Sequence, residues 1–167
     1  MKKTTSNSVL FSILTENQKG VLARILAIID RPNYRLETMT MGKTDVNGQV
    51  LITLEALIPA AEQNNIARRI EKIIEVEKIE CRSLDQTQVL RSGLFQVNLA
   101  TADHDFWRLI QKSGATVTGA SAGRLLLQKT AQAEDLRDLY NILDREYLES
   151  YSETTLPQLH ELYRVAE

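Results

Sequence analysis

The order in which the apolar residues change their spacing is the feature that most constrains the fold of this chain. Alternation at every second position, typical of strands, covers residues 9–15 and 50–57, while residues 34–43 are expected to be extended and residues 76–84 to form a short strand. Helical spacing covers residues 20–30 and, after Pro59, the isoleucines at 66, 70, 73 and 74. Asn47-Gly48 supplies a hairpin turn between the second and third strands. The order strand, helix, strand, strand, helix, strand predicts a ferredoxin-like βαββαβ domain, with helices on one face of an antiparallel sheet.

The second half of the sequence repeats this plan less clearly. Strands are expected over residues 90–100, 115–120, 124–129 and, with the weakest pattern, 149–156. One helix is expected from Asp103, whose side chain can cap it, to Gly114, where it ends. A second helix is expected over residues 133–147. We therefore expect an α+β chain with two ferredoxin-like βαββαβ domains in tandem, over residues 8–84 and 88–156, followed by a tail or helix over 157–167. The polar stretch 85–88 is the expected boundary.

Charge and composition exclude several classes of protein. The formal net charge is −2 at pH 7, so the chain lacks the basic surface that nucleic-acid binding needs. Its apolar runs are far shorter than the roughly 20 residues that span a bilayer. Residues 1–8 are read as a tail, not as a signal peptide. Cys81 is the single cysteine, which excludes an internal disulfide and fits a reducing compartment. We expect a cytoplasmic protein that binds neither nucleic acid nor membrane.

The turn from Asn17 to Leu22 connects the first strand to the first helix. Unpaired backbone N–H groups and the positive end of the helix dipole attract a small anion at such a place. Gly20 allows close approach to the backbone, and the Asn17 side chain can both donate and accept hydrogen bonds. The turn is thus a candidate seat for the carboxylate and ammonium groups of an amino acid. An ordinary turn that only caps the helix is the alternative.

A small sheet with helices on one face leaves its other face and its edge strands open. We expect Met39, Met41 and Leu51 or Leu57 on the bare face. Apolar surface of this kind favours association, so the sequence predicts a homodimer with two-fold symmetry, joined edge to edge or face to face.

No catalytic or metal-binding set is predicted. Neighbouring residues at a helix start seldom converge on one ion, so Asp103-His104-Asp105 is expected to cap and to face solvent. His160 has no nucleophile or carboxylate pattern beside it. Ser121-Ala122-Gly123 is expected to be a hairpin turn, and Phe106 and Trp107 to be core anchors.

Two segments resemble a known family. Residues 11–25, Phe-Ser-Ile-Leu-Thr-Glu-Asn-Gln-Lys-Gly-Val-Leu-Ala-Arg-Ile, are similar to the opening of the small, regulatory subunits of acetolactate synthase. Residues 34–40, Tyr-Arg-Leu-Glu-Thr-Met-Thr, resemble the second strand of that family. The resemblance is good over residues 8–82 and loose over 88–150. It implies that the first domain is an ACT domain, because these subunits begin with one and continue with a second ferredoxin-like domain.

The resemblance also implies a function. Such a subunit is not an enzyme on its own. It activates a large catalytic subunit in branched-chain amino-acid biosynthesis and makes it sensitive to feedback inhibition by a branched-chain amino acid, usually valine. The catalytic partner, and not this chain, carries the cofactors thiamine diphosphate, a divalent metal and often FAD. The effector binds between the ACT domains of a homodimer.

By position, the resemblance assigns the effector site to residues of the turn and of the second strand. These residues are Asn17, Lys19, Gly20, Val21, Leu22 and Arg35. Asn17 would hold the polar end of the ligand, and the amides near Gly20, Val21 and Leu22 would face its carboxylate.

Two positions depart from the family pattern. Arg35 stands where the family commonly has asparagine, and it either clamps the carboxylate or fills the site and abolishes valine binding. The Arg-Thr-Gly segment near the end of the family has no match, and Ser152-Glu153-Thr154-Thr155 stands in its place. A stand-alone ACT-domain amino-acid sensor, or a ligand-free interaction module acting on another target, is the alternative function.

Overall fold

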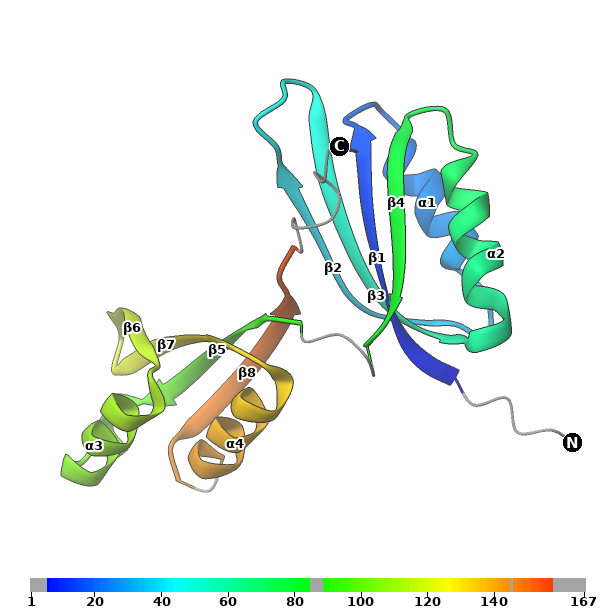
Figure 1. Ribbon diagram of the computed structural model, residues 1–167. Helices are drawn as coiled ribbons and strands as arrows, with labels where there is room; N and C mark the ends of the chain where they lie inside the picture. The colour runs from blue at the N-terminus through cyan, green and yellow to red at the C-terminus, as the bar shows by residue number, and fades with distance from the viewer. Residues whose placement is uncertain (1–5, 85–88, 145, 158–167) are drawn as a thin grey trace, which may run out of the picture. The chain divides into compact units, whose positions relative to one another are not determined.

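The computed structural model describes residues 6–84, 89–144 and 146–157. The chain forms two compact units, one of Met1–Gln88 with Thr155–Glu167 and the other of Val89–Thr154. Each unit contains a four-stranded sheet accompanied by helices (Figure 1). The expected pair of ferredoxin-like domains is confirmed. The stretch predicted as the boundary, 85–88, lies outside the described residues, as does all of the predicted tail except Pro157.

In the first unit the elements follow the predicted order. They are β1 (Ser6–Glu16), α1 (Val21–Ile29), β2 (Arg35–Lys43), β3 (Gln49–Pro59), α2 (Ala60–Glu71) and β4 (Val76–Ser83). The strands lie in the order β2-β3-β1-β4, so β2 and β4 form the edges of the sheet. The predicted hairpin joins β2 to β3, and its Gly48 has a φ of 81°, which favours glycine.

One face of this sheet packs against both helices and forms the core of the first unit. Phe11 of β1 stands in register with Leu54 of β3 and Cys81 of β4. Phe11 and Leu54 are fully buried, together with Ile25 of α1 and Ile70 of α2. Full burial of each such apolar side chain contributes roughly 1.5–3 kcal/mol, which holds the helices on the sheet. Burial also raises the pKa of the Cys81 thiol to about 11, so this thiol is protonated at neutral pH.

Edge strand β2 differs from the prediction in the face on which its methionines lie. Met39 and Met41 share the helix side of the sheet with their register partners on β3, and they are 37% and 43% exposed. The prediction that they lie on the face without helices is therefore wrong, because pairing with β3, and not alternation alone, fixes the face. Leu51 and Leu57 do lie on that face. It is not bare, because Leu51 is only 3% exposed.

Helix α2 is shorter than predicted. It ends at Glu71, and the chain turns over residues 72–75 to enter β4. Ile73 packs partly against the core, whereas Ile74 is 95% exposed. The prediction that Ile74 continues the apolar stripe of the helix is wrong, because the chain has already left helical geometry to reverse direction.

The second unit repeats the arrangement. Its elements are β5 (Arg91–Asn98), the short 3-10 helix η2 (Leu99–Thr101), α3 (His104–Ser113), β6 (Thr116–Ser121), β7 (Arg124–Ala131), α4 (Ala133–Leu143) and β8 (Leu148–Thr155). The strand order is β6-β7-β5-β8, which matches that of the first unit. The weakly patterned closing strand is therefore present as β8. Ala122 and Gly123 form the predicted hairpin turn between β6 and β7, directly after Ser121 at the end of β6.

Local signals in the second unit act as predicted at both ends of α3. The Phe106 amide donates a hydrogen bond to Asp103 Oδ1 at 2.8 Å, and Gly114 ends the helix with a φ of 71°. Phe106 is fully buried, which confirms it as a core anchor. Trp107 is 38% exposed and meets the Phe106 ring edge to face, so the prediction that Trp107 is buried is wrong. A helix turns successive residues by about 100°, so two neighbours seldom both face one core.

Candidate functional site

The loop between β1 and α1 is held by backbone hydrogen bonds to its neighbours. The Asn17 amide donates to the Gly48 carbonyl at 2.7 Å, which joins the loop to the β2–β3 hairpin. The Gln18 amide donates to the Glu16 carbonyl at 2.9 Å. Gly20 then begins the helix with a φ of 87°, a left-handed conformation that side chains other than glycine adopt with strain. The sequence therefore needs glycine at this position for its backbone conformation.

The first turn of α1 presents amides that are not paired. The Val21 amide donates to the Gln18 carbonyl at 3.3 Å. The amides of Leu22 and Ala23 form no hydrogen bond with any part of the chain that the structure describes. No side chain caps this helix end, and its first turn carries no acidic residue. Apart from Gly20 and its two neighbours in the chain, no heavy atom of the described residues lies within 4 Å of the position that a Gly20 Cβ would occupy, so a small anion has space to approach. These features favour a carboxylate at this end of the helix.

A polar hollow of about 460 Å³ opens beside this loop. Its lining includes Asn17 and Gln18 from the loop and Asn47 from the hairpin, together with the carboxylates of Glu16 and Glu77. Amide side chains and carboxylates accept hydrogen bonds from an ammonium group. The hollow and the helix end together offer complementary charges to the two ends of an amino acid.

The start of α1 is also held to the sheet through Glu75, in the turn before β4. Arg24 forms an ion pair with the Glu75 carboxylate, and the Thr15 hydroxyl donates to the Glu75 carbonyl at 2.8 Å. The hydrogen bond from Arg24 holds the pKa of the Glu75 carboxyl below its usual range. The loop is thus positioned by contacts to both the hairpin and the approach to β4.

Arg35 lies far from the loop within one chain. It is the first residue of β2 and stands in register with Leu57, whereas Lys43, at the end of β2 nearest the loop, stands in register with Val50. This register places Arg35 and Lys43 about 25 Å apart along the sheet. The Arg35 side chain is 75% exposed and pairs with Glu37 at 2.8 Å. The structure therefore brings Asn17, Lys19, Gly20, Val21 and Leu22 together on one loop and leaves Arg35 apart.

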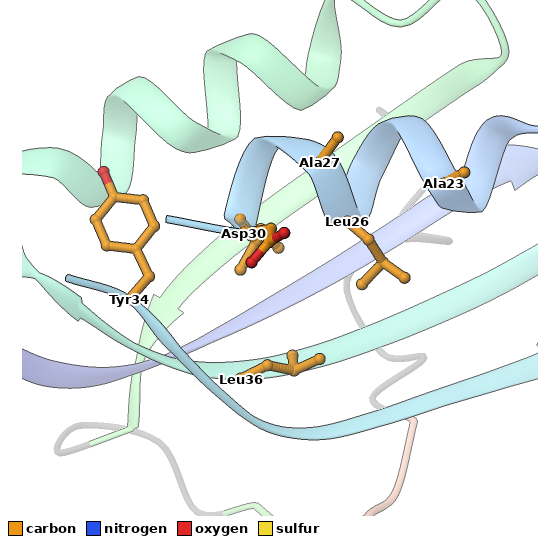
Figure 2. A pocket seen from close by; sticks show the side chains of 7 residues that line it. Ala23, Leu26, Ala27, Asp30, Tyr34 and Leu36 are labelled. Carbon is orange, nitrogen blue, oxygen red and sulfur yellow. The ribbon is translucent and has the colours of Figure 1, made fainter. Parts of the chain in front are cut away.

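An apolar groove that the sequence analysis missed runs between α1 and the start of β2. It has a volume of about 540 Å³, and its lining includes Ala23, Leu26 and Ala27 of α1 with Leu36 of β2. Figure 2 shows Leu26 extending from α1 toward the strand that carries Leu36. The signal in the sequence is the pair of small residues, Ala23 and Ala27, one helical turn apart with Leu26 beside them.

Tyr34 and Asp30 lie at one end of this groove (Figure 2). The Tyr34 hydroxyl donates a hydrogen bond to Glu62 of α2. Partial burial and this hydrogen bond raise the pKa of Tyr34, so its hydroxyl remains a donor at neutral pH. The side chain thereby fixes the start of β2 against α2 and limits the groove at this end.

Known proteins resemble this chain in sequence and in fold. The ACT domain family matches residues 17–79, which include the loop, α1 and the hairpin. The fold and this match thus define a protein that contains an ACT domain. Acetolactate synthase small subunits are its relatives: that of Mycolicibacterium smegmatis is 24% identical over 134 residues, or 80% of this chain and 79% of the relative. That of Mycobacterium bovis is 29% identical over 134 residues, or 80% of each chain. The expected resemblance to the acetolactate synthase small-subunit family is confirmed.

A solved structure supports the fold across both units. The acetolactate synthase small subunit of Thermotoga maritima has a TM-score of 0.75 and 18% identity, covering 89% of this chain and 93% of that one. Among the described residues, no group of His, Cys, Asp and Glu is arranged to hold a metal ion. No helix in the described part of the chain has the length and apolar character needed to cross a membrane.

Proposed function

We propose that this chain is the non-catalytic regulatory subunit of an acetolactate synthase. It activates a thiamine-dependent catalytic subunit and confers feedback control by a branched-chain amino acid, with valine as the first candidate. The observation that carries this proposal is the similarity to small subunits over 134 residues, because that length extends beyond the ACT domain into the second unit. A stand-alone ACT sensor would need only the first unit to resemble these proteins.

The ACT domains are proposed to pair through β2. This strand is an edge of its sheet, and it carries exposed apolar side chains: Leu36 is 41%, Met39 37% and Met41 43% exposed. An unpaired edge with apolar side chains favours the addition of another strand. Antiparallel pairing of β2 with its copy about a two-fold axis near Met39 would cover these side chains and lie beside the α1–β2 groove.

This pairing would also complete the effector site. With Met39 near the axis, Arg35 of a second copy comes opposite Lys43, at the end of the sheet where β1 leads into Asn17. Arg35, which lies about 25 Å from Lys43 along β2 within one chain, is thus replaced near the loop by Arg35 of the second copy. The Arg35 guanidinium would approach the ligand from the second copy, while the loop approaches it from the first.

Each part of a branched-chain amino acid has a proposed partner. The free amides of Leu22 and Ala23 donate hydrogen bonds to the carboxylate at the positive end of α1, and the Arg35 guanidinium of the second copy forms an ion pair with it. Asn17 and the Glu16 carboxylate face the ammonium group. The apolar side chain of the ligand lies toward the proposed dimer interface between the two β2 strands, next to the α1–β2 groove.

Regulation then follows from linkage. Ligand bound at the dimer interface stabilises one arrangement of the paired sheets, and the catalytic subunit binds one arrangement better than the other. Couplings of this kind are typically about 1–3 kcal/mol, which corresponds to roughly 5- to 150-fold changes in affinity. Thiamine diphosphate, the divalent metal and FAD belong, in this proposal, to the catalytic subunit.

Reconstitution with a catalytic subunit tests the proposal. The purified chain is mixed with the acetolactate synthase large subunit of the same genome, and acetolactate formation is measured with and without valine. We expect a several-fold higher rate with the chain, and a lower rate again when valine is added. The isolated second unit, residues 89–154, and a large subunit from an unrelated source are the controls. An unchanged rate at saturating chain would contradict the subunit proposal and favour an ACT protein with another target.

Calorimetry tests the effector site separately from the enzyme assay. We expect valine to bind the wild-type chain, and Asn17→Ala to weaken binding about ten- to hundredfold, because a hydrogen bond to a charged group contributes roughly 1.5–3 kcal/mol. Arg35→Asn is expected to weaken binding for the same reason. Arg31→Asn, at an exposed position outside the loop, is the matched control. A silent wild type together with binding by Arg35→Asn would show instead that Arg35 fills the site.

A further inference from the structure

Glu75 contacts the chain on both sides of the loop that carries the proposed effector site. It is the last residue of the turn between α2 and β4. Before the loop, the Glu16 amide and the Thr15 hydroxyl donate to the Glu75 carbonyl, at 2.9 and 2.8 Å. After the loop, the Arg24 guanidinium pairs with the Glu75 carboxylate. The end of β1 and the first turn of α1 are therefore fixed to one residue, which lies 51 positions beyond Arg24 in the sequence.

The Glu75 carboxylate depends on Arg24. Its Oε1 atom accepts a hydrogen bond from the guanidinium, whereas its Oε2 atom is buried and has no hydrogen-bond partner among the described residues. The Glu75 side chain is 14% exposed, and that of Arg24 is 47% exposed. A carboxylate this far from water is costly to leave without a cation. The ion pair therefore constrains the position of Arg24 more than a fully exposed pair would.

The turn that carries Glu75 is itself fixed to the core. The Ile73 amide donates to the Ile70 carbonyl at 3.0 Å, and the Val76 amide donates to the Ile73 carbonyl at 2.9 Å. Ile70 is fully buried between α2 and the sheet. Glu75 thus extends from a well-packed part of the first unit and can hold the loop against it.

The position of Arg24 determines where the free amides of α1 lie. Leu22 and Ala23 directly precede Arg24 in the first turn of the helix. The Arg24 amide donates to the Gly20 carbonyl at 3.1 Å, which closes this turn, so the turn moves as one piece. Hydrogen bonds weaken steeply when donor and acceptor are misaligned. Donors that are already in place bind an anion better, because no ordering is needed on binding.

We propose that Glu75 is a positioning residue for the effector. Through Arg24 and the end of β1, it holds the free amides of Leu22 and Ala23 in the orientation that binds the carboxylate, and it does not touch the ligand. This inference rests on the proposed function, because it concerns the same site.

Calorimetry with valine tests the role of the ion pair. Glu75→Gln removes the charge and keeps the backbone carbonyl that holds the end of β1, and we expect the dissociation constant to rise about three- to tenfold. Arg24→Gln should have a similar effect, and the double variant should lose no more than either single one, because the two residues act as a unit. Arg24→Lys, which keeps the charge, should recover most of the affinity. Glu71→Gln, the same change at the exposed end of α2, is the matched control and should change the constant less than twofold.

Amide hydrogen exchange without ligand separates this inference from the proposed function. In Glu75→Gln we expect the amides of Glu16 and Asn17 to exchange at least about threefold faster, and the amide of Ile13, in the middle of β1, to change less than twofold. If the wild type binds no valine, the effector proposal fails, and the exchange rates still decide whether Glu75 positions the loop. Unchanged exchange at Asn17 would overturn the inference. Equal acceleration at Ile13 would also overturn it, because Glu75 would then stabilise the whole sheet and not the loop.

Discussion

Replacing Phe11 with alanine is expected to lower the free energy of unfolding of the first unit by about 3–5 kcal/mol, the usual cost of removing a fully buried aromatic side chain. Phe11 is 0% exposed and lies between Leu54 and Cys81 on the face that both helices cover. The surrounding strands are paired on both sides of β1, so they cannot collapse far into the cavity. Urea denaturation with amide hydrogen exchange measures the loss.

The matched control for this substitution is Phe95→Ala in the second unit. Phe95 is also 0% exposed, and its core cluster shares no residue with that of Phe11. We expect each substitution to accelerate exchange mainly in its own unit, because each unit has a separate core. Equal loss of protection in both units from either substitution would show that they unfold as one, contrary to this expectation.

Replacing both Met39 and Met41 with aspartate is expected to raise the dissociation constant of the proposed homodimer at least about a hundredfold, because carboxylates would be buried unpaired and would face their copies across the two-fold axis. The side chains are 37% and 43% exposed in one chain, so the fold of the monomer should be retained. Sedimentation velocity measures the dissociation, and circular dichroism measures the fold. Valine binding should be lost together with the dimer, since the proposed site needs both copies.

Ile74→Asp is the matched control for the β2 substitutions. Ile74 is 95% exposed and precedes β4, the opposite edge of the sheet. The Ile74→Asp substitution introduces a negative charge in place of an apolar side chain, as the β2 substitutions do, and we expect the dimer to persist. If the dimer persists in the Met39→Asp, Met41→Asp double variant but dissociates in Ile74→Asp, the dimer interface lies at β4. That result would contradict the proposed pairing through β2.

Local signals predicted most of the fold. Asn47-Gly48 predicted the β2–β3 hairpin, and Asp103 with Gly114 predicted both ends of α3. These residues act through backbone conformation and short-range hydrogen bonds, which depend little on distant parts of the chain. Ile74 was misplaced because the end of α2 is set by the entry into β4, which the helical spacing does not record.

The candidate site was predicted in part. The loop from Asn17 to Leu22 has the strand before it and the helix after it that the sequence suggested, and the structure adds the positive φ at Gly20. The apolar groove beside α1 was missed, because Ala23 and Leu36 meet only once β2 takes its place in the sheet. Arg35 was grouped with the loop by family position, and the register of β2 on β3 then separated them within one chain.

The sequence by itself determined the order of the elements, the turns between them and the free amides at the start of α1, because spacing, glycine and capping residues act over a few positions. Only the tertiary structure decided that Met39 and Met41 lie on the helix side, that Arg35 lies at the end of β2 away from the loop, and that the second sheet face is shielded. Strand order and register arise from pairing between residues far apart in the chain, and a one-residue shift in that pairing exchanges the two faces of a strand.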